Sequence, residues 1–236
     1  MDILVDRFEL FRDGFWLTVQ LCLLSAVLAL VLGTVVAILR ISPVPPLRAV
    51  GTAYVTVFRN VPLTVVMFFT AFGLPELGSN AAFMRIPGLT TLFSRLGIDL
   101  PYFRFVILAL GLYTAAFVCE AIRSGVNAVA AGQSEAARAL GLTFLQNLRH
   151  VVLPQAWKAA VVPLGSVLIA MIKNSALAGS FGVIGDLSQT ADVLTSTEGL
   201  PLIPVFVGIS IGYLILTIPL GVVLDRVEAR RAAMAR

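Results

Sequence analysis

The stretch FWLTVQLCLLSAVLALVLGTVVAIL, residues 15–39, contains no charged side chain and is followed directly by Arg40. As a helix rising 1.5 Å per residue it covers roughly 37 Å, which is enough to cross the ~30 Å hydrocarbon core of a bilayer with some tilt. The residues before it carry four acidic and two basic side chains, whereas a cleaved signal peptide begins with a basic segment. The stretch therefore predicts a transmembrane helix that stays in the protein.

Four further apolar runs follow in a chain of 236 residues, of which 58% are hydrophobic and only 13% charged. The charged share is about half of the ~25% typical of a soluble domain, so the composition excludes an ordinary water-soluble enzyme. The second run contains Arg59 and Pro62, and the proline predicts a kink there. We therefore expect an all-α integral membrane protein with five transmembrane helices in one domain, residues 15–224. The predicted spans are residues 15–39, 51–74, 101–119, 159–184 and 200–224.

Basic residues are distributed unevenly over the segments between these spans. If the N-terminus lies outside, the cytoplasmic segments hold ten Arg and Lys residues and the exterior segments hold four. Cytoplasmic loops of membrane proteins collect basic residues, so this orientation is favoured over its inverse. The chain is then a multi-pass protein of the cytoplasmic membrane, with residues 1–14 extracytoplasmic, the loop 120–158 cytoplasmic and a basic cytoplasmic tail at residues 225–236. The exterior basic residues are Arg7, Arg12, Arg85 and Arg95.

Small residues recur at helical spacing in two of the spans. Ala29, Gly33 and Ala37 follow one another at intervals of four residues, and so do Gly208 and Gly212. Such residues let helix backbones approach closely. Glycine and alanine are also common in membrane helices generally, so both interpretations stay open at this point.

The sequence lacks the motifs of common catalytic and metal sites. It has no GxxxxGK[ST] phosphate loop, no HExxH helix and no GxSxG turn, and its only histidine is His150. Cys22 and Cys119 lie inside apolar runs, without the additional ligands that a zinc site requires. The basic residues form no block of the kind that binds nucleic acid. We therefore expect no enzyme activity, no bound metal or cofactor and no nucleic-acid partner.

The most informative polar segment is EAIRSGVNAVAAGQSEAARALGLTFLQNLRHVVLPQAWK, residues 120–158. Its alanine-rich first half favours a helix that stops at Gly141, and a second short helix is predicted for residues 143–153, ending at Pro154. Glu120 and Arg123 stand one helical turn apart and can pair. A helical hairpin of this size is unstable alone in water, so it must pack either on its own bundle or on a partner protein.

These residues also carry a resemblance. GQSEAARALGL, residues 132–142, followed by LPQA and then KNSAL, resembles the permease subunits of ATP-binding-cassette (ABC) importers. The longer string FVCEAIRSGVNAVAAGQSEAARALGL and Arg59 with Asn60 and Pro62 are similar to the polar amino acid uptake family of five-span permeases. RISPVPPLRAVGTAYVTVFRNVPLTVV, residues 40–66, most resembles the glutamate-uptake permeases of that family.

The resemblance implies a type I ABC importer permease fold in which the cytoplasmic hairpin seats in a groove of a separate ATPase. Two ATPase copies would bind ATP and Mg and drive alternating access, a second permease subunit would complete a heterodimer or a homodimer, and an extracytoplasmic binding protein would deliver a polar amino acid, with glutamate favoured. The coupling residues that the resemblance implies are Gly132, Gln133, Glu135, Ala136, Ala137, Arg138, Leu140, Gly141 and Leu142.

Ionisable residues inside the predicted spans are costly in hydrocarbon and usually face a cavity or a partner. Lys173 could therefore attract a substrate carboxylate, or it could pair with a carboxylate of the bundle such as Glu120 or with one of a partner chain. Arg59 could line the path or only shape the kink. In a self-sufficient secondary transporter or channel, the alternative function, the same two residues would be ion or gating sites. The candidate path residues are Arg59, Asn60, Glu120, Lys173, Asn174 and Ser175.

Overall fold

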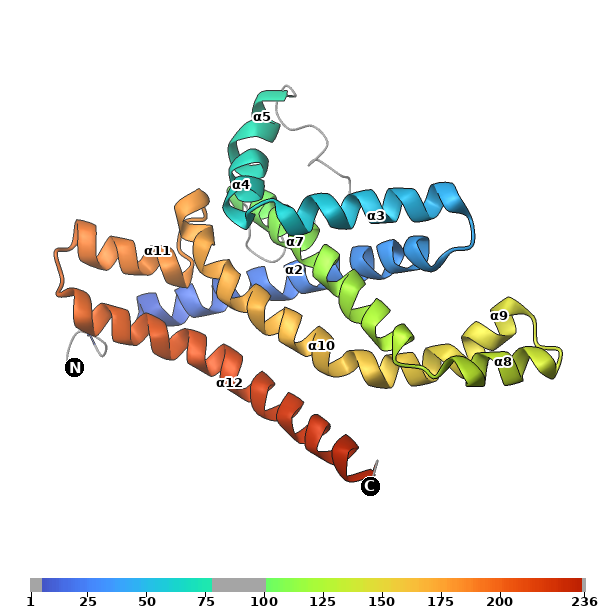
Figure 1. Cartoon of the computed structure of the whole chain (residues 1–236). Coiled ribbons are helices and arrows are strands. Elements are labelled where there is room, and N and C mark those ends of the chain that lie inside the picture. The colour runs from blue at the N-terminus through green and yellow to red at the C-terminus, as the bar shows by residue number, and fades with distance from the viewer. Residues whose placement is uncertain (1–5, 78–100, 235–236) are drawn as a thin grey trace.

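The computed structural model describes residues 6–77 and 101–234 of the chain, and every regular element within those ranges is helical (Figure 1). Four stretches in it are long and apolar enough to cross a membrane: Phe8–Ile41, Tyr102–Asn127, Leu148–Phe181 and Leu202–Arg230. A bent pair of helices makes a fifth if it is counted as one span. The expected all-α membrane fold is confirmed; the side of the membrane that each end faces stays a prediction. The predicted exterior residues Arg85 and Arg95 lie outside the described ranges.

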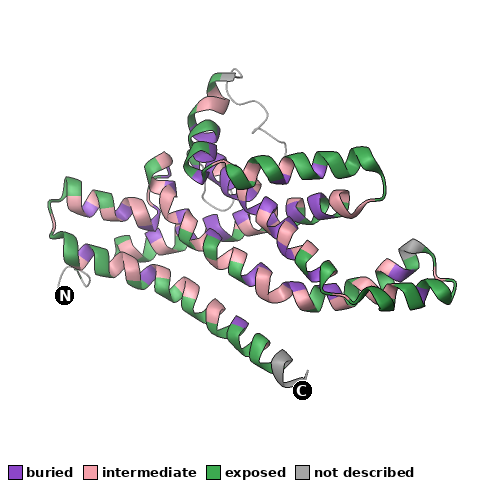
Figure 2. Cartoon of the chain, in the orientation of Figure 1, coloured by how far each residue is buried: buried purple, intermediate pink, exposed green. Residues whose placement is uncertain are grey.

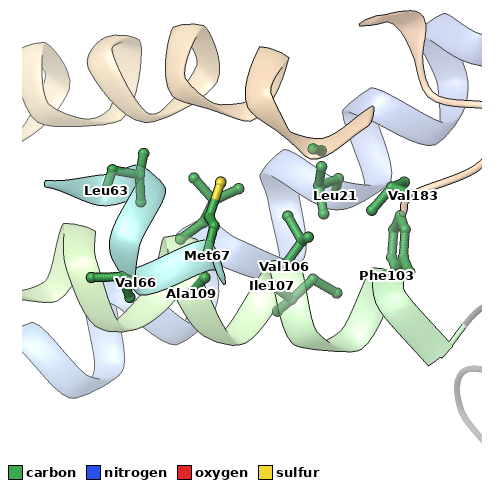
Figure 3. Close-up of a cluster of buried hydrophobic side chains, with 11 residues drawn as sticks. Leu21, Leu63, Val66, Met67, Phe103, Val106, Ile107, Ala109 and Val183 are labelled. Atoms are coloured by element: carbon green, nitrogen blue, oxygen red, sulfur yellow. The ribbon is translucent and has the colours of Figure 1, made fainter. Parts of the chain in front are cut away.

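The bundle is organised around α7 (Pro101–Asn127), which packs along α2 (Phe8–Ile41) on one side and α10 (Leu153–Asn174) on another. Figure 3 shows Phe103, Val106 and Ala109 of α7 meeting Leu21 of α2 and Met67 in a buried apolar cluster. Helix α12 (Leu202–Met234) lies at the periphery with most of its surface exposed (Figure 2). It continues without a break into the predicted basic tail, whose first residues are therefore helical.

The small residues of α2 face α7. Ala29 and Ala37 are buried, and a Cβ added at Gly33 would lie 2.6 Å from the Cβ of Val118 and 2.8 Å from the carbonyl oxygen of Ala115. On α12, a Cβ at Gly212 would meet the side chain of Leu187 at 2.5 Å. The close approach of helix backbones is thus a real feature of the stripe on α2.

The second apolar run is broken rather than kinked. Helix α3 (Pro45–Asn60) ends just before Val61, and α4 (Leu63–Phe68) begins after Pro62 at a bend of 103°. Val61 has an extended backbone, because a proline pushes the residue before it out of the helical region, and Pro62 itself is also non-helical, with ψ +139°. Five π-helical residues, Phe69–Gly73, and α5 (Leu74–Leu77) follow. The position predicted for the kink is confirmed, but the interruption is a full change of direction.

The polar loop at residues 120–158, predicted to be cytoplasmic, contains α8 (Ala131–Ala139) and α9 (Phe144–Asn147), joined at Gly141 as predicted. The prediction that the second hairpin helix ends at Pro154 is wrong. Helix α9 passes through a π-helical turn, Leu148–Val152, directly into α10, with Pro154 in the first turn. A proline normally clashes with the carbonyl four residues before it, and the wider π turn shifts that carbonyl, so the helix continues.

The opposite end of α10 changes character after Asn174. Residues Ser175–Phe181 form a 3-10 helix, a short α11 (Leu187–Asp192) follows, and π-helical residues Val193–Thr197 lead towards α12. Helix α11 is fixed on α2, because the backbone N–H of Leu187 donates a 3.0 Å hydrogen bond to the buried Thr18 hydroxyl. The polar groups at this end therefore belong to the packed bundle.

Candidate functional site

The turn between the two hairpin helices has a defined backbone. Gly141 has φ +84°, its N–H donates to the Arg138 carbonyl at 2.9 Å, and the N–H of Leu142 donates to the Ala137 carbonyl at 3.2 Å. This pair of bonds is the Schellman arrangement, which closes a helix with a left-handed residue and is easiest for glycine. The sequence therefore fixes the shape of the hairpin tip.

The next helix is capped in turn. The Thr143 N–H donates to Oε1 of Gln146 at 2.9 Å, and the Gln146 N–H donates back to the Thr143 hydroxyl at 3.4 Å. This reciprocal pattern is a capping box, which satisfies backbone donors that a helix leaves free at its start. Both sides of the turn are thus held by local hydrogen bonds.

Asn147 joins α9 to α8. Its side chain is only 5% exposed, and its Nδ2 donates to the Ser134 hydroxyl at 2.6 Å and to the Ser134 carbonyl at 3.4 Å. The Gln155 amide likewise donates to the side chain of Gln133. The sequence did not single out Asn147, because its partner lies on the other helix and no local pattern marks it. These bonds make the hairpin one unit rather than two independent helices.

The predicted coupling residues divide into an inner and an outer set. Ala137 is buried, whereas Leu140 is 82% exposed at the tip. Glu135 and Arg138 are also exposed, and a Cβ added at Gly132 would meet nothing within 4 Å. The remaining outward-facing residues are Gln133, Ala136 and Gly141. A hydrogen-bonded tip that carries an exposed leucine, with exposed charged side chains on the preceding helix, can dock into a complementary groove.

Three arginines, one each from α2, α3 and α7, surround the carboxylate of Glu120 in α7. Arg40 at the end of α2 bonds its Oε1, Nη1 of Arg59 in α3 lies 3.5 Å from the same oxygen, and Nη1 of Arg123 lies 3.4 Å from Oε2. The predicted pairing with Arg123 is confirmed. Lys173 does not pair with Glu120: it is exposed and forms no ion pair within the described ranges. Its pairing with a carboxylate of a partner chain stays a prediction. The sequence missed Arg40, because it appeared only as the end of a span.

A cavity of about 210 Å³ lies between α7 and α10, and Asn174 is the predicted path residue that lines it. Its other walls are formed by Tyr113, Thr114, Phe117, Val167, Ala170 and Met171. Ser175 is not among them: it is fully buried, and its hydroxyl donates to the Ile172 carbonyl at 2.7 Å. Asn60 is exposed and donates to the Thr56 carbonyl at 2.7 Å. The structure thus brings Asn174, but not Ser175, to a polar-edged cavity.

Asp186 is a fully buried carboxylate between the 3-10 helix and α11. It caps α11 by accepting hydrogen bonds from the backbone N–H groups of Ser188 and Gln189 at 3.2 and 3.0 Å and from the Ser188 hydroxyl at 2.7 Å. Burial raises the pKa of this carboxyl, and the bonds from Ser188 and Gln189 oppose the shift. The string DLSQ, an N-cap residue followed three positions later by glutamine, is the signal that identifies this cap.

No group of three or more His, Cys, Asp or Glu side chains within residues 6–77 and 101–234 is placed to hold a metal ion. The arrangement in these ranges consists of a docking tip, an arginine cluster and a small cavity between helices. Such features suit a protein that moves a solute.

Comparison with known proteins gives these features a context. Residues 29–231 match the family described as "Binding-protein-dependent transport system inner membrane component". The chain is 41% identical over 220 residues to the glutamate transport system permease protein GluC of Corynebacterium efficiens, covering 93% of this chain and 92% of that one. It is 37% identical over 230 residues to the probable glutamine ABC transporter permease protein GlnM of Bacillus subtilis, covering 98% and 97%.

Solved structures agree with these relatives. A crystal structure of an amino acid ABC transporter with histidines superposes with a TM-score of 0.80 at 30% identity, covering 96% of both chains. An inward-facing MetNI methionine ABC transporter shares the fold, with a TM-score of 0.71 at 22% identity over 95% of this chain and 97% of that one. The chain belongs to the binding-protein-dependent transport system inner membrane components and is a multi-pass membrane permease of an amino acid ABC importer.

Proposed function

We propose that this chain is the permease subunit of an ATP-driven importer of glutamate or a closely related polar amino acid. The support is the 41% identity to a glutamate permease together with the 37% identity to a probable glutamine permease. A separate ATPase, present in two copies, binds ATP and Mg and hydrolyses the nucleotide. An extracytoplasmic binding protein delivers the amino acid, and a second permease subunit, related or identical, completes the path.

The observation that carries the coupling mechanism is the exposure of Leu140 on a rigid tip. An apolar side chain that is 82% exposed on a cytoplasmic hairpin is stabilised when a partner buries it. The Schellman bonds at Gly141 and the Asn147–Ser134 bonds keep the tip in one shape, so force applied to it is passed to the bundle. Because α9 continues into α10, a displaced hairpin also moves a helix that lines the cavity.

The path for the amino acid runs along the face where α7 meets α10. Asn174 offers an amide to the cavity, and the exposed cation Lys173 lies beside it in the sequence. A charged side chain that is exposed within a membrane span faces water or a partner rather than lipid. This face is therefore turned towards the second permease subunit, and Arg59 and Asn60, at the break after α3, belong to the same path.

Replacing Leu140 tests the coupling proposal. L140D is expected to lower ATP-dependent amino acid uptake at least tenfold. Burial of the leucine side chain in a partner groove contributes about 1.5–3 kcal/mol to docking, and an apolar groove rejects the carboxylate that replaces it. V44S is the matched control, since Val44 is an exposed apolar residue in the short link between α2 and α3 rather than in the hairpin. Wild-type uptake by L140D, with normal amounts of assembled complex, would contradict the assignment.

A further inference from the structure

The cluster around Glu120 has more positive than negative charge. Three guanidinium groups, from Arg40, Arg59 and Arg123, surround one carboxylate, so its formal charge is three minus one, or +2. Arginine stays protonated in proteins, and Arg59, the member of the cluster that lies within a predicted span, is in a region where unpaired charge is costly. The cluster is therefore suited to receiving a further anionic group.

Arg59 is the member that is free to change partners. Its Nη1 lies 3.5 Å from the Glu120 carboxylate, longer than the ~2.8 Å of a strong charge-assisted bond, and its side chain is 48% exposed. Arg40 is only 14% exposed at its side chain and also donates to the Cys119 sulfur, while Arg123 is held on the same helix as Glu120. Glu120 keeps two cationic neighbours when Arg59 turns away.

Arg59 also stands next to the cavity. Its guanidinium carbon lies 6.0 Å from the centre of the Phe117 ring, and Phe117 forms part of the cavity wall together with Asn174 and Thr114. At this distance the ring can attract the cation without using any of the five N–H donors of the guanidinium. Because the Arg59 side chain is 48% exposed, a carboxylate that reaches this wall can approach it.

The backbone at this position has the form expected beside a solute path. Arg59 lies in the last turn of α3, directly before the 103° break. At membrane depth, interrupted helices occur where they are buried in protein or line a water-filled cavity, and they mark the solute sites of many transporters. The exposed guanidinium of Arg59 at the break agrees with a helix interruption that lines a water-filled cavity.

Resting on the function proposed above, we infer that Arg59 binds a carboxylate of the transported amino acid, and that Glu120 holds its guanidinium until that carboxylate replaces it. Glu120 is then an internal competitor of the substrate. Arg59 is the residue that favours acidic amino acids, or amino acid carboxylates in general, on the path. No covalent step is involved, only an exchange of ion-pair partners.

The test uses the complete transporter, both permeases with the ATPase, in lipid nanodiscs without the binding protein, and measures equilibrium binding of radiolabelled L-glutamate and L-glutamine. R59Q is expected to weaken glutamate binding about tenfold or more, the loss expected for one charge-assisted bond. R123Q is the matched control, because it removes the same charge from the same cluster at nearly the same distance. Its expected loss is less than threefold, and R59K is expected to restore part of the affinity.

Two further results complete the test. E120Q is expected to tighten glutamate binding several-fold, because the competing carboxylate is gone. Weakening of glutamate alone by R59Q assigns Arg59 to the side-chain carboxylate, and equal weakening of glutamine assigns it to the α-carboxylate. The inference is overturned if R59Q and R123Q lose glutamate affinity equally, if R59Q loses none, or if a stable E120Q binds glutamate more weakly. It is also overturned if the wild-type complex takes up amino acid when the binding protein is present but binds neither glutamate nor glutamine in its absence. Failure of that wild-type uptake contradicts the proposed function instead.

Discussion

At the scale of single residues, the hairpin tip requires the left-handed backbone of Gly141, with φ +84°. Its surroundings are open, so only the backbone, and not a steric clash, resists a side chain there. G141A is expected to cost about 1–2 kcal/mol in the local hairpin conformation. We expect reduced ATP-dependent uptake and a weaker response of ATPase activity to the binding protein, measured in proteoliposomes.

A matched control for this substitution exists in the same chain. Gly199 also has positive φ, +66°, and open surroundings, but it lies between the π-helical turn and α12 rather than in the hairpin. G199A is therefore expected to lower thermal stability by a similar amount while leaving the ATPase response intact. If both variants lose the same fraction of coupled uptake, general destabilisation and not hairpin geometry explains the effect.

Asp186 gives a second prediction at this scale, concerning pH. Burial raises the pKa of the Asp186 carboxyl in the folded protein above the ordinary carboxyl value of about 3.9. Below that ordinary value the carboxyl is protonated in both the folded and the unfolded state, so it does not lower the stability. As the pH rises through the raised pKa, the folded protein has to hold a buried charge and stability is lost. D186N keeps a capping oxygen without the charge, so its stability relative to the wild type is expected to be greater at pH 8 than at pH 4.

D186A separates the two roles of this residue. It loses the cap as well as the charge and is expected to be less stable than D186N by about 1 kcal/mol. Thermal unfolding of the two variants and the wild type across this pH range measures both effects. Equal stability of D186N and D186A would show that capping of α11 contributes little.

At the scale of elements, the hairpin depends on the bonds between Asn147 and Ser134. N147A is expected to cost about 1–3 kcal/mol of hairpin stability, since it leaves the Ser134 hydroxyl at 2.6 Å without its donor. Hydrogen exchange of α8 measures the loosening. A double-mutant cycle with S134A isolates the pair, and additive effects of the two substitutions would contradict a direct link between the helices.

The helices also show where sequence reasoning succeeds and where it stops. Apolar runs and Gly141 predicted the membrane helices and the hairpin turn, because both follow from local composition and backbone preference. Pro154 predicted a helix end that does not occur, because the π turn that accommodates it is not encoded in any simple pattern. The arginines around Glu120 come from helices far apart in sequence, so only the pairing with Arg123, one turn away, was predictable.

At the scale of the whole molecule, the bundle is held by close contacts at glycines. A Cβ at Gly125 of α7 would lie 2.4 Å from the Ala156 carbonyl and 2.8 Å from the Ala160 Cβ of α10. G125A is therefore expected to force these helices apart and to destabilise the protein by about 1–3 kcal/mol. G221A, in an open position on α12, is expected to be neutral or stabilising. Equal melting temperatures of the two variants would contradict this account of the packing.

The central claim is that a separate ATPase subunit acts on the hairpin and thereby drives the transport of solute across this bundle. The direct measurement is uptake of radiolabelled L-glutamate into proteoliposomes that contain the permease subunits, supplied with binding protein, with or without the ATPase and ATP. The account predicts uptake only when both ATPase and ATP are present. Glutamate uptake by the permease subunits alone would contradict it and would indicate a self-sufficient transporter or channel.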